Sequence, residues 1–142
     1  MESNERKYID ILVNHFWKLG YFTVSRRFGT YLPEPSNVGK FRVDIIGRQK
    51  NRYAIGITLL EVDLKDDALI EKIVFLASRK TRNSNSPVML IIGVQPECYR
   101  QIKNIVDRLS PEVRKNIKLT QIHDVSVTRQ SISKRKQQII FS

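Results

Sequence analysis

The sequence predicts a single α/β domain in which a mixed β-sheet lies between helices. Two observations predict this class: a β-rich hairpin across residues 41–60 and a strand–helix–strand unit across residues 87–122. The hairpin requires an antiparallel pair, whereas the later unit requires a parallel crossover. The 142 residues, 41% of them hydrophobic, are enough for one core. We therefore expect one domain over residues 1–124, followed by a basic C-terminal extension over residues 125–142.

The first half of the chain should form one helix and three strands. We predict a helix over residues 4–19, strands over 21–28, 41–48 and 53–60, and a loop over 29–39. Apolar side chains recur at helical spacing up to Leu19, and Gly20 then ends the helix. The turn at residues 49–51 separates two apolar runs, which predicts the hairpin.

The second half should alternate helices and strands. We predict helices over residues 64–82 and 96–109, and strands over 87–94 and 117–122. Asp63 is a candidate N-cap for the first of these helices. Its inward face should carry Leu69, Ile73, Leu76 and Ala77. Residues 87–94 form a continuous apolar run, which is typical of a strand buried on both faces.

The charge of the chain predicts a polyanionic partner. It contains 25 Lys and Arg against 14 Asp and Glu, a formal net charge of +11. Nucleic-acid phosphates are the natural counterpart of such a surface. The candidate DNA-binding residues are Arg26, Arg27, Lys40, Arg42, Lys65 and Arg79.

The chain carries no sign of a membrane span or of secretion. It has no apolar run of roughly 18 residues and no signal peptide at its start. We therefore expect an intracellular, nucleoid-associated protein that does not enter a membrane. His15 and His123 are isolated from other metal-ligating side chains, so zinc binding and His-based catalysis find no support.

Three features of the chain indicate a family. These are an acidic residue in the first helix, the order of the elements, and Asp44 within the run Arg42-Val43-Asp44-Ile45-Ile46. In these three features the chain resembles the PD-(D/E)XK nuclease superfamily. Within that superfamily the chain is similar to the small archaeal Holliday-junction resolvases. The resemblance implies a restriction-endonuclease-like αβββαβ core over about residues 4–94. It also implies a catalytic centre in which a helix Glu, a hairpin Asp and a Glu-x-Lys tripeptide surround Mg²⁺ and the scissile phosphate.

The resemblance assigns two metal ligands to this chain, Glu5 and Asp44. Glu5 is also a residue type that the start of a helix favours, so a structural role stays open. Asp44 lies between two apolar neighbours, and a buried carboxylate is costly unless something binds it. If it is a strained catalytic group, Asp44→Ala should leave the protein folded or stabilise it.

The chain departs from the superfamily at the tripeptide. Gly56 stands where the second carboxylate belongs, and Thr58 stands where the lysine belongs. A relocated site would recruit Glu61, with Asp63, and take its amine from Lys65 or Lys72. Residues 61 and 63 have the opposite strand parity to 56 and 58, so Glu61 would need a β-bulge to join Asp44. The structural alternative places Glu61 at a strand end and Asp63 at a helix cap.

Three functions remain open from the sequence. The first is a DNA-binding protein of repair or recombination with a degenerate catalytic centre, acting on duplex or branched DNA. The second is an active Mg²⁺-dependent endonuclease that uses Asp44, Glu5, Glu61 and Lys72. The third is an assembly subunit without nucleic acid. Candidate protein partners are a second copy of the chain and a sliding clamp. The clamp is a candidate because residues 137–142 resemble the peptides that dock on sliding clamps.

Overall fold

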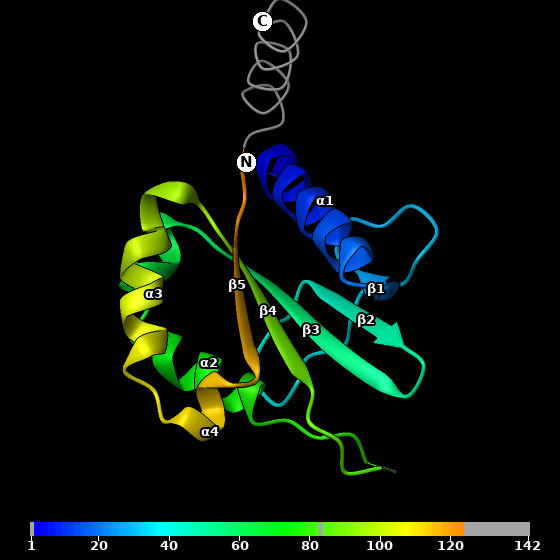
Figure 1. The fold of residues 1–142 in the computed structure, drawn as a ribbon. Helices are drawn as coiled ribbons and strands as arrows, with labels where there is room; N and C mark the ends of the chain where they lie inside the picture. The colour runs from blue at the N-terminus through cyan, green and yellow to red at the C-terminus, as the bar shows by residue number, and fades with distance from the viewer. Residues whose placement is uncertain (1, 83, 124–142) are drawn as a thin grey trace, which may run out of the picture.

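The computed structural model describes residues 2–82 and 84–123, and these form a mixed α/β fold (Figure 1). The helices are α1 (Glu2–Lys18), α2 (Leu69–Ala77), α3 (Tyr99–Asp107) and α4 (Pro111–Arg114), with 3-10 helices η1 (Glu61–Lys65) and η2 (Pro96–Cys98). The strands are β1 (Phe22–Arg26), β2 (Ile45–Gln49), β3 (Arg52–Leu59), β4 (Met89–Val94) and β5 (Ile117–Gln121). The predicted class, a mixed sheet flanked by helices, is confirmed.

The five strands form one sheet in the order β1-β2-β3-β4-β5. β1, β2 and β3 pair antiparallel, whereas β3, β4 and β5 pair parallel. The predicted hairpin is present, and Lys50 adopts a positive φ of 55° at its tip. Gly20 has a φ of 91° directly after α1, a conformation that glycine adopts without steric cost.

One face of the sheet packs against α1. Ile9, Leu12 and Phe16, at helical spacing, are fully buried against Ile45 of β2 and Ile91 of β4. The same face carries Gly56 and Thr58, because side chains alternate along β3 and Ala54 belongs to this cluster. The first residues of α1 therefore lie on the side of the sheet to which Thr58 points.

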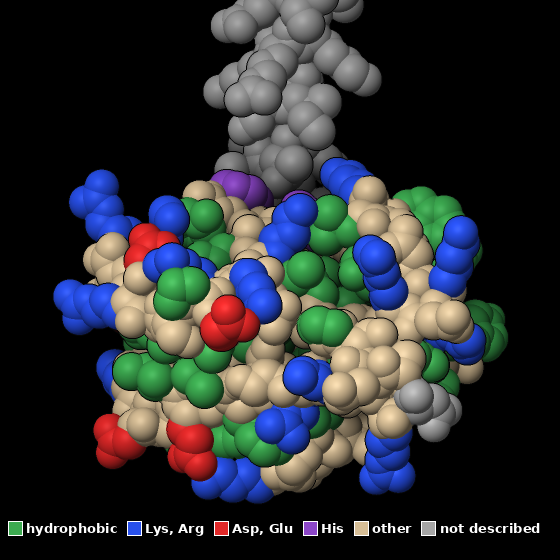
Figure 2. Space-filling model, turned by 60° about the horizontal axis from the view of Figure 1, so that its bottom comes forward, with side chains coloured by type: hydrophobic (Ala, Val, Ile, Leu, Met, Phe, Trp, Pro, Cys, Tyr) green, Lys and Arg blue, Asp and Glu red, His purple; other side chains and the backbone are tan. Residues whose placement is uncertain are grey.

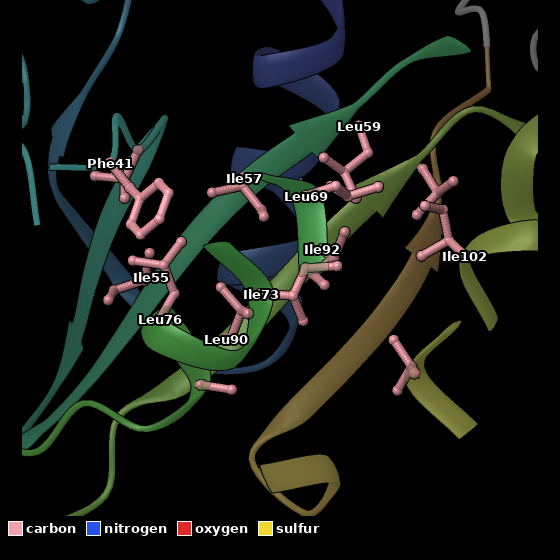
Figure 3. Close-up of a cluster of buried hydrophobic side chains, with 14 of the residues drawn as sticks. Phe41, Ile55, Ile57, Leu59, Leu69, Ile73, Leu76, Leu90, Ile92 and Ile102 are labelled. Carbon is pink, nitrogen blue, oxygen red and sulfur yellow. The ribbon is translucent and has the colours of Figure 1, made fainter. Parts of the chain in front are cut away.

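The opposite face packs against α2 and α3. The predicted inward residues of α2, including Ile73 and Leu76, are buried against β3 and β4 (Figure 3). Ile102 extends this cluster from α3. Cys98 is buried at the start of α3, and burial raises the pKa of its thiol above the ordinary value. As a buried thiol it acts as a small apolar residue.

Several predicted boundaries were wrong. Residues 61–65 form η1 and α2 begins only at Leu69, so the helix predicted over residues 64–82 is shorter at both ends. Asp63 does not cap α2; its carboxylate accepts a hydrogen bond from the Leu60 N–H at 2.7 Å, within the 3-10 turn. The strand predicted from residue 41 begins at Ile45, because residues 42–44 lie in an irregular segment before it.

Two further expectations concern residues 124–142, which lie outside the described residues. These are the basic extension and the clamp-docking resemblance at residues 137–142. Among residues 2–82 and 84–123, no helix is long and apolar enough to cross a membrane.

Candidate functional site

A depression of about 250 Å³ lies where α1, β3, η1 and α2 approach one another. Six residues singled out in the sequence line it: Glu5, Arg27, Arg42, Asp44, Asp63 and Lys72. Thr58, at the tripeptide position, lines it as well. The fold therefore gathers most of the predicted catalytic residues into one place. Glu61 is the exception, because it is exposed and does not line the depression.

Asp44 lies immediately before β2 and is held on every side. Its N–H donates to the Gly56 carbonyl at 2.9 Å, and its carbonyl accepts from the Arg27 N–H at 2.9 Å. Its carboxylate Oδ1 accepts from Arg27 Nη1 at 2.8 Å. Its Oδ2 accepts from both the N–H and the hydroxyl of Thr58, at 2.7 and 3.0 Å. The side chain is 9% exposed, so a nearly buried carboxylate is fully satisfied by protein groups.

Arg27 joins the two predicted metal ligands. Its Nη2 donates to Glu5 Oε2 at 3.0 Å while Nη1 donates to Asp44. Its guanidinium carbon lies 4.9 Å from the centre of the Phe28 ring. Burial lowers the pKa of Arg27, but the hydrogen bonds and negative charges of Asp44 and Glu5 outweigh burial and raise the pKa above its ordinary value. The guanidinium is therefore a permanent cation within this pair of carboxylates.

The Glu5–Arg27–Asp44 arrangement does not fit a Mg²⁺ ion as it stands. Mg²⁺ requires several oxygen ligands at close range in near-octahedral geometry. Here the oxygens of Asp44 are taken by Arg27 and Thr58, and the Glu5 carboxylate shares the same guanidinium. Within residues 2–82 and 84–123, no group of three or more His, Cys, Asp or Glu side chains could hold a metal.

The glycine at the tripeptide position is a packing requirement. A Cβ built on Gly56 would lie 2.8 Å from Phe16 Cζ and 3.1 Å from Ile45 Cβ. Contacts this short are incompatible with any side chain unless Phe16 moves. The space that a second carboxylate would need is therefore filled by an aromatic ring from α1.

Of the two carboxylates in the alternative tripeptide at residues 60–63, one lines the depression and the other does not. Asp63 lines the depression, but its carboxylate binds the Leu60 N–H. The Glu61 side chain is exposed, and its N–H donates to Gln95 Oε1 at 3.2 Å. The β-bulge that a relocated site would require is absent from β3, which ends at Leu59 and pairs with β4 in regular register to that point. Lys72 of α2 lines the depression with its side chain half-buried.

The predicted DNA-binding residues differ in exposure and in partners. Arg26 and Arg27 are mostly buried and pair with carboxylates, Arg26 with Asp10. Lys40 pairs with Glu71 at 2.9 Å in an exposed ion pair. Arg42 is exposed at the depression, whereas Arg79 lies against Phe75, 3.7 Å from its ring centre, beyond the C-terminal end of α2.

The helix predicted over residues 64–82 would have placed Lys65, Lys72 and Arg79 on one face at seven-residue spacing, but the structure lacks a helix of that length there. Lys65 belongs to η1 and Arg79 lies beyond the end of α2, so the three residues do not share one helix. Arg48, Lys80 and Arg82 line one cleft together with Arg79, and this grouping was not predicted from the sequence. The positive charges of the hairpin and of the segment after α2 were visible, but their proximity depends on how the strands pair.

Comparison of the chain with known proteins assigns no family. No family model matches it, and no curated protein or solved structure is significantly similar to it.

Proposed function

We propose that the chain is a DNA-binding α/β domain of restriction-endonuclease-like architecture whose catalytic centre has become a structural ion-pair network. The single observation that carries this proposal is the position of Arg27, within hydrogen-bonding distance of both Glu5 and Asp44. A cation supplied by the protein takes the part that Mg²⁺ has in the superfamily that the chain resembles. The network then stabilises the fold without offering a metal site.

The charge of the chain supports nucleic acid as the partner. Only a few of its cations pair with carboxylates among the described residues, and the formal net charge is +11. Unneutralised Lys and Arg bind phosphates and release counterions, which is independent of base sequence. We accordingly place the protein in DNA repair or recombination, where branched and broken DNA is bound by shape and charge.

An active endonuclease is the second candidate, and one observation favours it. Lys72 and Asp63 line the same depression as Asp44, so an amine and a third carboxylate are near the predicted site. This would require Arg27 to leave the carboxylates when DNA and Mg²⁺ arrive. Asp63 would also have to release the Leu60 N–H.

Binding and cleavage are tested together on the full chain. We expect fluorescence anisotropy to detect binding to duplex and four-way-junction DNA without metal. Affinity should fall by about a thousandfold between about 50 and 200 mM NaCl if about six phosphates are contacted. Absence of binding at low salt would overturn the proposal and favour an assembly subunit.

The cleavage arm separates the two nucleic-acid hypotheses. With Mg²⁺ or Mn²⁺ added, we expect the same DNA substrates to stay intact. Cleavage that Lys72→Ala abolishes and the exposed neighbour variant Lys65→Ala does not would establish the endonuclease instead. Lys65 is a suitable control because it does not line the depression.

A further inference from the structure

A second cleft, separate from the depression around Asp44, lies at the opposite end of β3. Its volume is about 660 Å³, and it shares no lining residue with the depression. Its walls are the turn that joins β2 to β3 and the segment that follows α2. We call it the basic cleft, because four cations line it: Arg48, Arg79, Lys80 and Arg82.

Within the part of the chain that the structure describes, no ion pair neutralises the charge of the basic cleft. No Asp or Glu lines it, and none of its four cations forms an ion pair with the residues that the structure describes. Figure 2 views the end of the molecule that carries the segment after α2: Lys and Arg side chains are spread across it, whereas acidic side chains lie mainly toward one side. Such a surface attracts phosphates and repels other cationic surfaces.

Two of the four cations are held in place by the fold. Arg79 Nε donates to the Phe75 carbonyl at 2.9 Å, and its guanidinium lies 3.7 Å from the centre of the Phe75 ring. Arg48 Nε donates to the Lys50 carbonyl at 2.7 Å, and its guanidinium lies 5.7 Å from the centre of the Tyr53 ring. Because both side chains are already ordered, binding a phosphate costs them little additional conformational entropy.

The segment after α2 is also braced. The Val88 N–H donates to the Arg79 carbonyl at 3.0 Å, and the Thr81 N–H donates to the Ser86 carbonyl at 2.9 Å. Lys80 and Pro87 form a β-bridge across it. Lys80 and Arg82 therefore line the cleft from a held backbone, and Arg48 lines it from β2.

The floor of the basic cleft is apolar. Ile46, Ile55 and Val88 line it, together with Tyr53, whose ring is half-buried. The cleft volume lies within the range of ligand pockets, roughly 300 to 1,000 Å³. A site that joins an apolar, aromatic floor to a cationic rim suits a nucleotide, which has a flat aromatic base and a negatively charged phosphate. In a duplex the bases are stacked inside and cannot reach such a floor, whereas an unpaired strand can present one.

We propose that the basic cleft binds an unpaired strand of nucleic acid, with one base on its floor beside Tyr53 and the neighbouring phosphates on its four cations. This inference rests on the proposed nucleic-acid function and adds to it a binding site for an unpaired strand. The protein would then engage DNA that exposes an unpaired strand.

The test compares two variants that lose the same charge. The cleft variant carries Arg48→Ala, Lys80→Ala and Arg82→Ala; the control variant carries Arg100→Ala, Arg108→Ala and Lys118→Ala. All six side chains are exposed, and none forms an ion pair with a described residue, so both variants should fold as the parent does. Melting curves check this before binding is measured.

Binding of a fluorescent oligothymidine and of a duplex of equal length is then measured against salt. We expect the cleft variant to bind the single strand at least about tenfold more weakly, with the slope of log K against log salt reduced by about 2. Its duplex affinity and both affinities of the control variant should stay within about threefold of the parent. Tyr53→Leu should weaken single-strand binding by about tenfold, because an aromatic face for one base is lost.

The possible failures are distinguishable. If the parent binds duplex but the cleft variant binds the single strand as well as the control variant does, this inference is overturned and the proposed function stands. If the parent binds neither DNA, the proposed function is overturned, and this inference with it. If a nucleoside monophosphate displaces the oligothymidine at equal concentration, the cleft is a free-nucleotide site and the strand is not its ligand.

Discussion

The ring of Phe16 lies directly over Gly56, so closely that a Cβ on residue 56 would approach the ring to 2.8 Å. Phe16 is fully buried, and Ile45 closes the same space from the neighbouring strand. The glycine is thus required by a residue forty positions earlier in the chain. The absence of a side chain at residue 56 and the presence of an aromatic ring at residue 16 are two sides of one packing arrangement.

The first prediction follows from this contact. We expect Gly56→Ala to lower the free energy of unfolding by about 2 kcal/mol, because the added methyl group overpacks the core. Phe16→Leu should relieve part of the clash, so the double variant should be more stable than the sum of the two single effects by about 1 kcal/mol. Urea denaturation of the four proteins measures both quantities. Additive effects would mean that Phe16 and Gly56 do not interact.

The second prediction concerns the ion pair between Arg27 and Asp44. The geometry reverses the expectation from the sequence that Asp44→Ala would be harmless. Asp44 accepts hydrogen bonds from Arg27 and Thr58, and its removal would leave a mostly buried guanidinium with only the half-exposed Glu5 as partner. We expect Asp44→Ala to cost about 3 kcal/mol of stability.

Glu5→Ala is the matched control for that prediction, since it removes the other carboxylate from the same guanidinium. The Glu5 side chain is 42% exposed, so its ion pair is screened by water and should contribute about 0.5 kcal/mol. Chemical denaturation at neutral pH compares the two variants. A gain in stability for Asp44→Ala would show that Asp44 is strained, and equal losses would show that Asp44 stabilises the fold no more than Glu5 does.

The third prediction is a pH dependence that originates at His15. Burial is the main cause that lowers the pKa of His15 below its ordinary value of 6.5, and the positive charges of Lys18 and His123 lower it further. Thr120 Oγ1 lies 3.4 Å from its ring nitrogens. The unfolded chain therefore binds a proton more readily than the folded protein does near pH 6.

The lowered pKa of His15 makes the folded protein less stable at acidic pH. The contribution of neutral His15 to stability is fully present above pH 6.5 and is lost as the pH falls below 6.5 toward the pKa of the folded state. We expect the melting temperature to fall over this range in the parent protein. The fall should be smaller in His15→Gln, whereas His123→Gln should keep most of it. An identical pH profile in His15→Gln would assign the effect to other groups.

The sequence predicted the sheet and its covering helices because each rests on local patterns. Helical spacing around Leu12 and the turn at residues 49–51 are visible within a few residues. The start of α2 was missed because η1 has the apolar content of a helix and no Gly or Pro separates it from Leu69. A change from 3-10 to α geometry leaves little trace in composition.

The candidate site was predictable only in part for a related reason. The burial of Asp44 followed from its apolar neighbours, and the fold brought Glu5 and Lys72 near it. The partner of Asp44 was not predictable, because Arg27 reaches it across a long loop and looked like one more surface cation. Likewise, the helical periodicity predicted that Phe16 is buried, but it did not predict which strand residue Phe16 would contact.

The last prediction concerns metal and catalysis. Because Arg27 already bridges Glu5 and Asp44, adding Mn²⁺ should not raise the melting temperature of the unmodified protein, and Mn²⁺-dependent cleavage of four-way-junction DNA should be absent. The tripeptide variant Gly56→Glu with Thr58→Lys should also stay inactive and lose stability, since the new carboxylate would meet the Phe16 ring. Only when Phe16→Ala and Arg27→Gln are added should space and free oxygens for Mn²⁺ appear together, detected as a rise in melting temperature with Mn²⁺. A rise in the unmodified protein that Asp44→Asn abolishes would contradict this account, because it would mean that the metal displaces Arg27 unaided.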